Sequence, residues 1–311
     1  KMLSEDEALS FELFNSQAER ADKLFAFRDH GYLFDQMNGA QSQLPAFLIN
    51  IHRVANIAEA EAYVSRIRDL GPLLDALSAQ SAERAAKGYA PPKWVYAYVI
   101  SDIGNLTKPD NAVIEDVTAK VGKLEIDAAE KARLVAAAKA AWAESAGPAY
   151  ARLQTEMKRQ QAVAPRQDGV WRMPGGKAYY EALLSNYTTT DMTAAQIHDL
   201  GLAEVARIHG EMTTIMKQVG FKGTLPQFFD HLRTSPQYYY TTREAYLADV
   251  AAKVKAMEAR LPAFFNTLPK APLQVKAVEA FREKSAGKAF YQSPSPDGSR
   301  PVHPAVVPVV E

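Results

Sequence analysis

Histidine, aspartate and glutamate are the side chains from which a cysteine-free chain can build a metal site, and the histidines here are widely spread. They are residues 30, 52, 198, 209, 231 and 303, and no His-Glu-x-x-His pair occurs among them. His198 and His209 fall near one face of a predicted helix, but eleven residues separate them by about 16 Å of rise. They cannot bind one ion together. We interpret both as polar flanks of a packed helix, although His209 beside Glu211 could join a site built with other segments.

Other catalytic patterns are missing from the sequence. There is no cysteine, which excludes disulfides, thiolate zinc sites and a catalytic thiol. Neither a glycine-rich phosphate-binding loop nor a Gly-x-Ser-x-Gly elbow occurs. The run Thr188 to Thr190 offers hydroxyls, but no base is marked nearby, and a loop leading into a helix cap explains it better.

An uncharged polar cluster interrupts the apolar segments near the start of the chain. It consists of Asn38, Gln41, Ser42 and Gln43, ahead of Pro45. Side-chain amides in such a place either satisfy buried backbone groups or line a binding site. Both interpretations stay open on the sequence alone.

The element expected to organise the fold is a long helix at about residues 193–219. Thr193 with Gln196 has the spacing of a capping box, and apolar residues then recur every three or four positions up to Val219. Gly201 lies in this stripe, where glycine costs about 1 kcal/mol of helix stability relative to alanine. We expect a neighbouring helix to approach closely there, and the other helices to pack around this one.

Most of the remaining chain also has helical signals. Ser4, Asn56 and Asp127 are each followed three residues later by glutamate, the spacing of a helix start. Pro72 is predicted to open a new helix after one that ends near Leu70. The fold class predicted is mainly α, a multi-helix array around the central helix, with a short β-hairpin near the C-terminus.

The spacing of apolar residues changes after about residue 268. Residues from Leu273 alternate with period two, and a second extended piece is expected up to Ser293, which predicts the hairpin. Five prolines follow between 294 and 308, so this tail is expected to be loosely held. The predicted domains are therefore 1–268 (helical), 269–293 (hairpin, the start of a truncated catalytic-type domain) and 294–311 (tail).

Composition limits the classes of partner. Of the 311 residues, 47% are hydrophobic and 23% charged, and 36 basic residues balance 36 acidic ones. Zero net charge argues against nucleic acid or an anionic membrane as a partner bound by bulk electrostatics. No apolar run approaches the length of a membrane span.

Several phrases together resemble one family, catalogued as domain of unknown function 885. They span about residues 30–300 in the family's order: QMNGAQSQLPAFLIN, RIRDLGPLLDAL, GVWRMPGGKAYYEALL, TTTDMTAAQIHDLGLAEVARIHGEM, FFDHLRTSPQYYY and LPKAPLQVKAVEAFREKSAGKAFY. The family looks like zinc metallopeptidases of the gluzincin type, mostly helical and sometimes exported or lipid-anchored. The resemblance thus implies a peptide substrate, zinc in a full-length relative, and an exported or periplasmic location.

The resemblance also implies where this chain departs from the family. The family's zinc-binding His-Glu and His-His signature lies downstream of the matched region, and no counterpart occurs in these residues. We therefore expect no cofactor and no catalytic residue in this chain. It resembles the N-terminal helical half of such an enzyme, cut as the catalytic sheet begins.

The leading hypothesis is that the chain forms one wall of a substrate cleft and is inactive alone. The predicted wall residues are Asn38, Gln41, Gln43 and Tyr291, polar groups in segments that the resemblance covers. The alternative is a non-catalytic helical scaffold or a peptide- or protein-binding module. A reading frame downstream that encodes the zinc signature would favour the first. Loss of a catalytic half would leave an apolar patch, so self-association is also expected.

Overall fold

The computed structural model describes residues 3–268, 273–283, 286–287, 289–293 and 303–306. Most of these residues are helical, which confirms the predicted mainly α class. None of the described helices is long and apolar enough to cross a membrane. The chain divides into two compact units, residues 1–31 with 169–240 and residues 32–168 with 241–311. The predicted boundary near residue 268 does not coincide with this division and stays a prediction.

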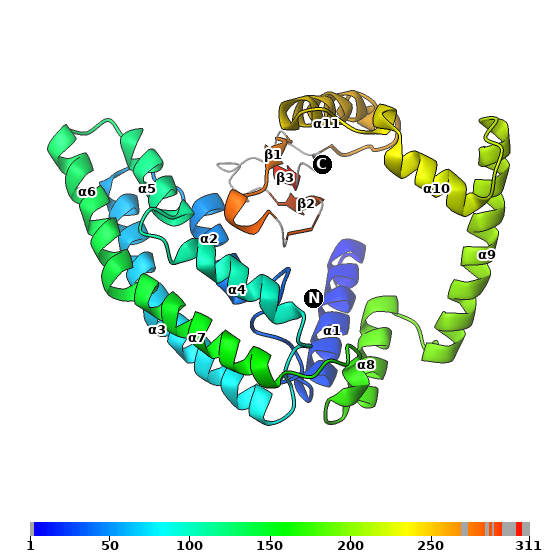
Figure 1. Ribbon diagram of the computed structural model, residues 1–311, viewed down its shortest axis with the longest axis horizontal. Helices are drawn as coiled ribbons and strands as arrows, with labels where there is room; N and C mark the ends of the chain where they lie inside the picture. The colour runs from blue at the N-terminus through cyan, green and yellow to red at the C-terminus, as the bar shows by residue number, and fades with distance from the viewer. Residues whose placement is uncertain (1–2, 269–272, 284–285, 288, 294–302, 307–311) are drawn as a thin grey trace. The chain divides into compact units, whose positions relative to one another are not determined.

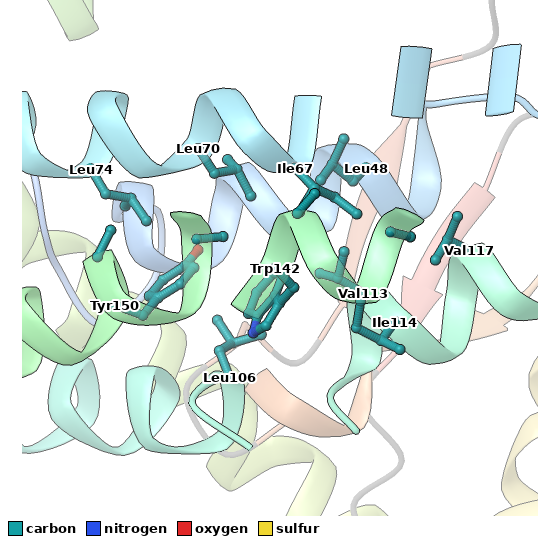
Figure 2. Packing of buried hydrophobic residues seen from close by; sticks show 14 of the residues in the cluster. Leu48, Ile67, Leu70, Leu74, Leu106, Val113, Ile114, Val117, Trp142 and Tyr150 are labelled. Carbon is teal, nitrogen blue, oxygen red and sulfur yellow. The ribbon is translucent and has the colours of Figure 1, made fainter. Parts of the chain in front are cut away.

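The hydrophobic core lies in the second unit. Long helix α3 packs against α6, the π-turn η1 and α7, and α4 packs against the other side of α7 (Figure 1). Figure 2 shows side chains from α2, α3, α4, α5, η1 and α7 meeting there. The rings of Trp142 and Tyr150 are stacked, with their centroids 5.8 Å apart. The described helices of this unit are α2 (Ala40–Asn50), α3 (Ile57–Ala86), α4 (Val95–Leu106), α5 (Ala112–Gly122), α6 (Ala128–Ala141), η1 (Trp142–Ala146), α7 (Gly147–Val163), α11 (Arg243–Glu258), η4 (Leu261–Ala263) and η5 (Ala280–Arg282).

Helix α3 runs without interruption through Gly71 and Pro72, where the sequence predicted two helices. A proline at residue 72 has no N–H for the Arg68 carbonyl one turn earlier. The Ser145 hydroxyl, on η1, donates to that carbonyl at 2.6 Å instead. Gly71 permits this approach, because a Cβ there would lie 2.1 Å from the Ser145 oxygen. A hydrogen bond from another element thus compensates for the proline.

The predicted helix at 193–219 exists, as α9, but its central position in the fold was wrong. The Thr193–Gln196 capping box is present. Of the helix's residues, however, only Met216 is buried, and its apolar stripe is largely exposed. A Cβ on Gly201 would meet no atom within 4 Å, so the close neighbour expected there is missing from the described residues. Apolar periodicity identifies the face that needs cover and does not identify what covers it.

Helix α9 belongs to the first unit, in which α1 packs against α8, and α9 against α10. Its helices are α1 (Glu5–Phe25), η2 (Val170–Arg172), α8 (Gly176–Thr188), α9 (Ala194–Gln218), α10 (Leu225–Thr234) and η3 (Pro236–Tyr238). The Ser4 capping box predicted for α1 is confirmed, but α1 contains no buried residue.

The predicted β-hairpin is replaced by a three-stranded sheet in the second unit. Strands β1 (Lys276–Ala277) and β2 (Ala289–Gln292) do not pair with each other. Between them lies β3 (His303–Val306), parallel to β1 and antiparallel to β2. Strand β3 falls within the tail predicted to be loose. The rest of that tail, residues 294–302 and 307–311, lies outside the described residues.

Replacement of Ser145 tests how α3 accommodates its proline. Ser145→Ala should lower the free energy of unfolding by about 1 kcal/mol, because the Arg68 carbonyl loses its donor. The loss should be smaller in a Pro72→Ala background, where the backbone again supplies an N–H. Urea unfolding of the four variants in this cycle measures the difference. Equal losses in both backgrounds would show that the hydroxyl does not replace the missing N–H.

Candidate functional site

A cavity of about 470 Å³ in the second unit brings together two segments far apart in the sequence. One segment is helix α2 with the turn before it, and the other runs from the short helix η5 (Ala280–Arg282) into strand β2. The lining residues are Met37, Asn38, Gln43, Ala46, Phe47, Asn50, Ile51, Arg282, Ala286, Gly287, Ala289, Phe290 and Tyr291.

Three of the four predicted wall residues, Asn38, Gln43 and Tyr291, line this cavity. The fourth, Gln41, does not line it and is completely buried. Its side-chain nitrogen donates to the Asp35 carbonyl at 2.6 Å, and its backbone carbonyl accepts the Tyr150 hydroxyl at 3.2 Å. Gln41 therefore has the structural role that the sequence left open for this cluster. Peptide binding by the other three stays a prediction.

The turn before α2 holds Asn38 at the rim of the cavity. The Asp35 carboxylate accepts the backbone N–H groups of Met37 and Asn38, both at 2.6 Å. Such a local bond from an aspartate side chain is typical of a tight turn. Gly39 then begins the helix, and a Cβ at this position would lie 2.3 Å from the Asp35 nitrogen. The close turn thus requires glycine.

A polar network joins the two walls of the cavity. Asn50, the last residue of α2, donates from its side chain to the Glu279 carboxylate. The same carboxylate accepts the Arg282 Nε–H at 2.7 Å, and the Arg282 guanidinium lies 5.0 Å from the centre of the Phe290 ring. Sequence reasoning missed Asn50, Glu279 and Arg282. Only the three-residue spacing of Glu279 and Arg282 marks a local pair.

Lys120 on α5 fixes the C-terminal end of α2. Its ammonium group donates to the carbonyls of Leu48 at 3.0 Å, Ile49 at 2.7 Å and His52 at 2.9 Å. It also pairs with Asp116 at 2.8 Å, which in turn accepts the Tyr63 hydroxyl at 2.9 Å. Burial lowers the pKa of Lys120 and raises that of Asp116. The last carbonyls of α2, which have no partner within the helix, are thus satisfied by a cation.

His52 completes this end of α2 as a neutral imidazole. Its Nε2 lies 2.9 Å from the Glu59 carbonyl, which can only accept, so Nε2 carries the proton. Its Nδ1 faces the Arg66 guanidinium and must accept from it. Burial lowers the His52 pKa, and the nearby Arg66 and Lys120 lower it further, against the raising effect of Glu59. A second proton on this ring would face a cation.

The histidines considered in the sequence do not assemble into a site. His198 and His209 lie exposed on α9. Within the residues that the structure describes, no group of three or more His, Asp or Glu side chains is arranged to hold a metal ion.

Comparison with known proteins identifies a family and a fold. The sequence matches the family described as "Bacterial protein of unknown function (DUF885)" over residues 1–306. A similar solved structure is "the putative lipoprotein from Colwellia psychrerythraea", with a TM-score of 0.82 and 24% identity. The likeness covers 89% of this chain and 49% of that one, so this chain spans about half of the neighbour's length. No curated protein matches.

Folding stability should fall between pH 7.5 and pH 5.5, in part because of His52. Its pKa is lowered in the folded protein, so the unfolded chain takes up this proton first, at about pH 6.5. The stabilisation by neutral His52 is therefore present above about pH 6.5 and is lost as pH falls towards the lower folded pKa.

Urea unfolding at the two pH values measures this loss of stability. His52→Gln should lose less on acidification than the parent protein, whereas His198→Gln, at an exposed position of α9, should lose as much. The same loss of stability on acidification in all three proteins would show that His52 does not contribute to it.

Proposed function

The chain belongs to the DUF885 family of bacterial proteins, and from this premise we propose that it forms one wall of a cleft that binds an extended peptide. One observation carries the proposal: strand β2 and helix α2 line the same cavity. The strand supplies backbone groups for pairing, and α2 and its preceding turn supply side-chain amides from Asn38, Gln43 and Asn50.

Strand β2 is suited to bind a peptide because it lies at an edge of the sheet. It pairs with β3 on one side, and no described strand pairs with its other side. Ala289, Phe290 and Tyr291 of β2 line the cavity. An extended peptide can add to such an edge by backbone hydrogen bonds, with adjacent pockets selecting its side chains.

Pro304 determines which backbone groups of β2 are available to a peptide. It is the register partner of Tyr291 and has no N–H. In an antiparallel pair, alternate residues exchange hydrogen bonds and the residues between them point away. Proline is compatible with the non-hydrogen-bonded position of the pair, because that position needs no N–H directed at the partner strand. The Tyr291 N–H and C=O then face the open edge of the sheet, where a peptide strand would lie.

The proposal assigns substrate binding to this chain and no hydrolytic step. The resemblance to zinc metallopeptidases supports a peptide as the ligand. The described part of the chain does not provide a set of ligands that fits zinc. Hydrolysis would need zinc-binding residues from the part of a longer relative that lies beyond the matched half.

We also propose an exported location. The solved neighbour is described as a lipoprotein, and the resemblance includes exported proteins. A peptide-binding role outside the cytoplasm is consistent with both.

Peptide binding through the β2 edge can be tested with N-methylated peptides. A fluorescent octapeptide should bind saturably, and N-methylation of alternate residues should leave its affinity within about threefold, because one edge keeps its donors. N-methylation of every residue should weaken binding by about tenfold or more, since each lost hydrogen bond costs about 0.5–1.5 kcal/mol. Fluorescence anisotropy measures both. Equal affinities of the unmodified and the fully N-methylated peptides would rule out strand addition.

A photo-crosslinking amino acid locates the peptide. Placed at Tyr291, which is 63% exposed, it should crosslink to the peptide. Placed at Tyr187, which is 79% exposed and lies on α8, it should not. Crosslinking at Tyr187 alone would place the peptide outside the cavity.

We also propose that the isolated chain self-associates through the exposed apolar stripe of α9. An uncovered stripe of this kind is typical of an interaction surface. Ile208→Glu, within the stripe, should shift the chain towards monomer in sedimentation velocity experiments. Leu202→Glu, about 120° from Ile208 around the same helix, should not. A parent protein that is monomeric at all concentrations would contradict this.

A further inference from the structure

We propose that the cavity between α2 and β2 selects an acidic side chain of the bound peptide, and that Arg282 recognises it. This inference rests on the proposed peptide-binding function and names the substrate class of the same site. It depends on the charges that line the cavity, on how Arg282 is held, and on its counterion.

Arg282 is the one charged residue among the described residues that line the cavity. No carboxylate occurs among these described lining residues. The other polar lining side chains are the amides of Asn38, Gln43 and Asn50 and the hydroxyl of Tyr291, all of which are neutral and can donate. A carboxylate entering the cavity would therefore meet donors and one cation, without an acidic lining group to repel it.

Arg282 is held in place before any ligand arrives. Its side chain is 7% exposed, with Nε bonded to Glu279 and the guanidinium over the face of Phe290. A guanidinium is planar and presents its N–H groups in one plane, the geometry that suits a carboxylate. Little side-chain entropy remains to be lost on binding, since the group is already fixed.

Glu279 reduces the selectivity and does not abolish it. It pairs with Arg282 and also accepts the Asn50 amide, so part of the guanidinium charge is already compensated. It does not line the cavity, whereas Arg282 does. A ligand carboxylate in the cavity would therefore meet Arg282 and not the Glu279 carboxylate, and we expect about tenfold selectivity for an acid over its amide, the ratio that 1.4 kcal/mol provides.

The competing interpretation is that the Arg282–Glu279 pair only joins the two walls. Amide side chains in the cavity would then accept glutamine and glutamate in a peptide equally well. Glutamate and glutamine have nearly the same size and shape, so a matched pair of peptides isolates the charge.

The experiment moves a single glutamate or glutamine through a neutral octapeptide and measures each affinity by fluorescence anisotropy on the full chain. At one position, the glutamate peptide should bind about tenfold tighter than its glutamine counterpart. At the other positions the two should bind within about twofold of each other. Glu279→Gln should increase the preference at that position by about threefold or more, because it removes the counterion while an amide oxygen can still accept from Arg282 and Asn50.

Arg282→Gln should abolish the preference in protein whose circular dichroism matches that of the parent. Because this side chain is buried and the variant could unfold, the Glu279→Gln result provides the second test. Equal binding of glutamate and glutamine at every position would overturn the inference and leave the proposed function intact. A Glu279→Gln variant with unchanged preference would also overturn it. Failure of every peptide to bind would refute the proposed function itself.

Discussion

The candidate site depends on the fixation of one helix end by a half-buried cation. Without Lys120, the last carbonyls of α2 would face the interior with no donor, and an unpaired buried polar group is costly. Its counterion Asp116 and the Tyr63 hydroxyl anchor the ammonium group to α5 and α3. The residues of α2 that line the cavity are therefore held in position by contacts with the main core. The opposite wall is attached to this fixed end by Asn50 and Glu279.

The same principle, a polar group from one element satisfying the backbone of another, explains how α3 tolerates Pro72. Ser145, on the π-turn η1, can reach the Arg68 carbonyl because Gly71 has no side chain. Helix α3 is consequently long enough to contact α6, η1 and α7 along one face. One hydroxyl and one glycine thus allow a single helix where local rules predict two.

Local signals in the sequence predicted local structure correctly. Thr193 with Gln196 and Asn56 with Glu59 mark real helix starts, because a cap is a bond between neighbouring residues. Signals whose outcome depends on distant residues were not sufficient. The compensation of Pro72 by Ser145 could not be inferred from spacing. The position of β3 between β1 and β2 depends on pairing between segments that no local pattern specifies.

The candidate site shows the same difference between what local sequence predicts and what depends on distant residues. Asn38, Gln43 and Tyr291 could be nominated because they are polar residues in segments that the family resemblance covers. Gln41 met the same criterion and is buried beneath the turn. Arg282 could not be nominated, because a Glu-Arg pair three residues apart is typical of a solvent-exposed helix face. In the structure the arginine is buried. Glu279 is bonded to Asn50, and the Arg282 guanidinium lies over Phe290, so the arginine is a fixed cation at the cavity wall. A fixed cation can discriminate between ligands that differ only in charge.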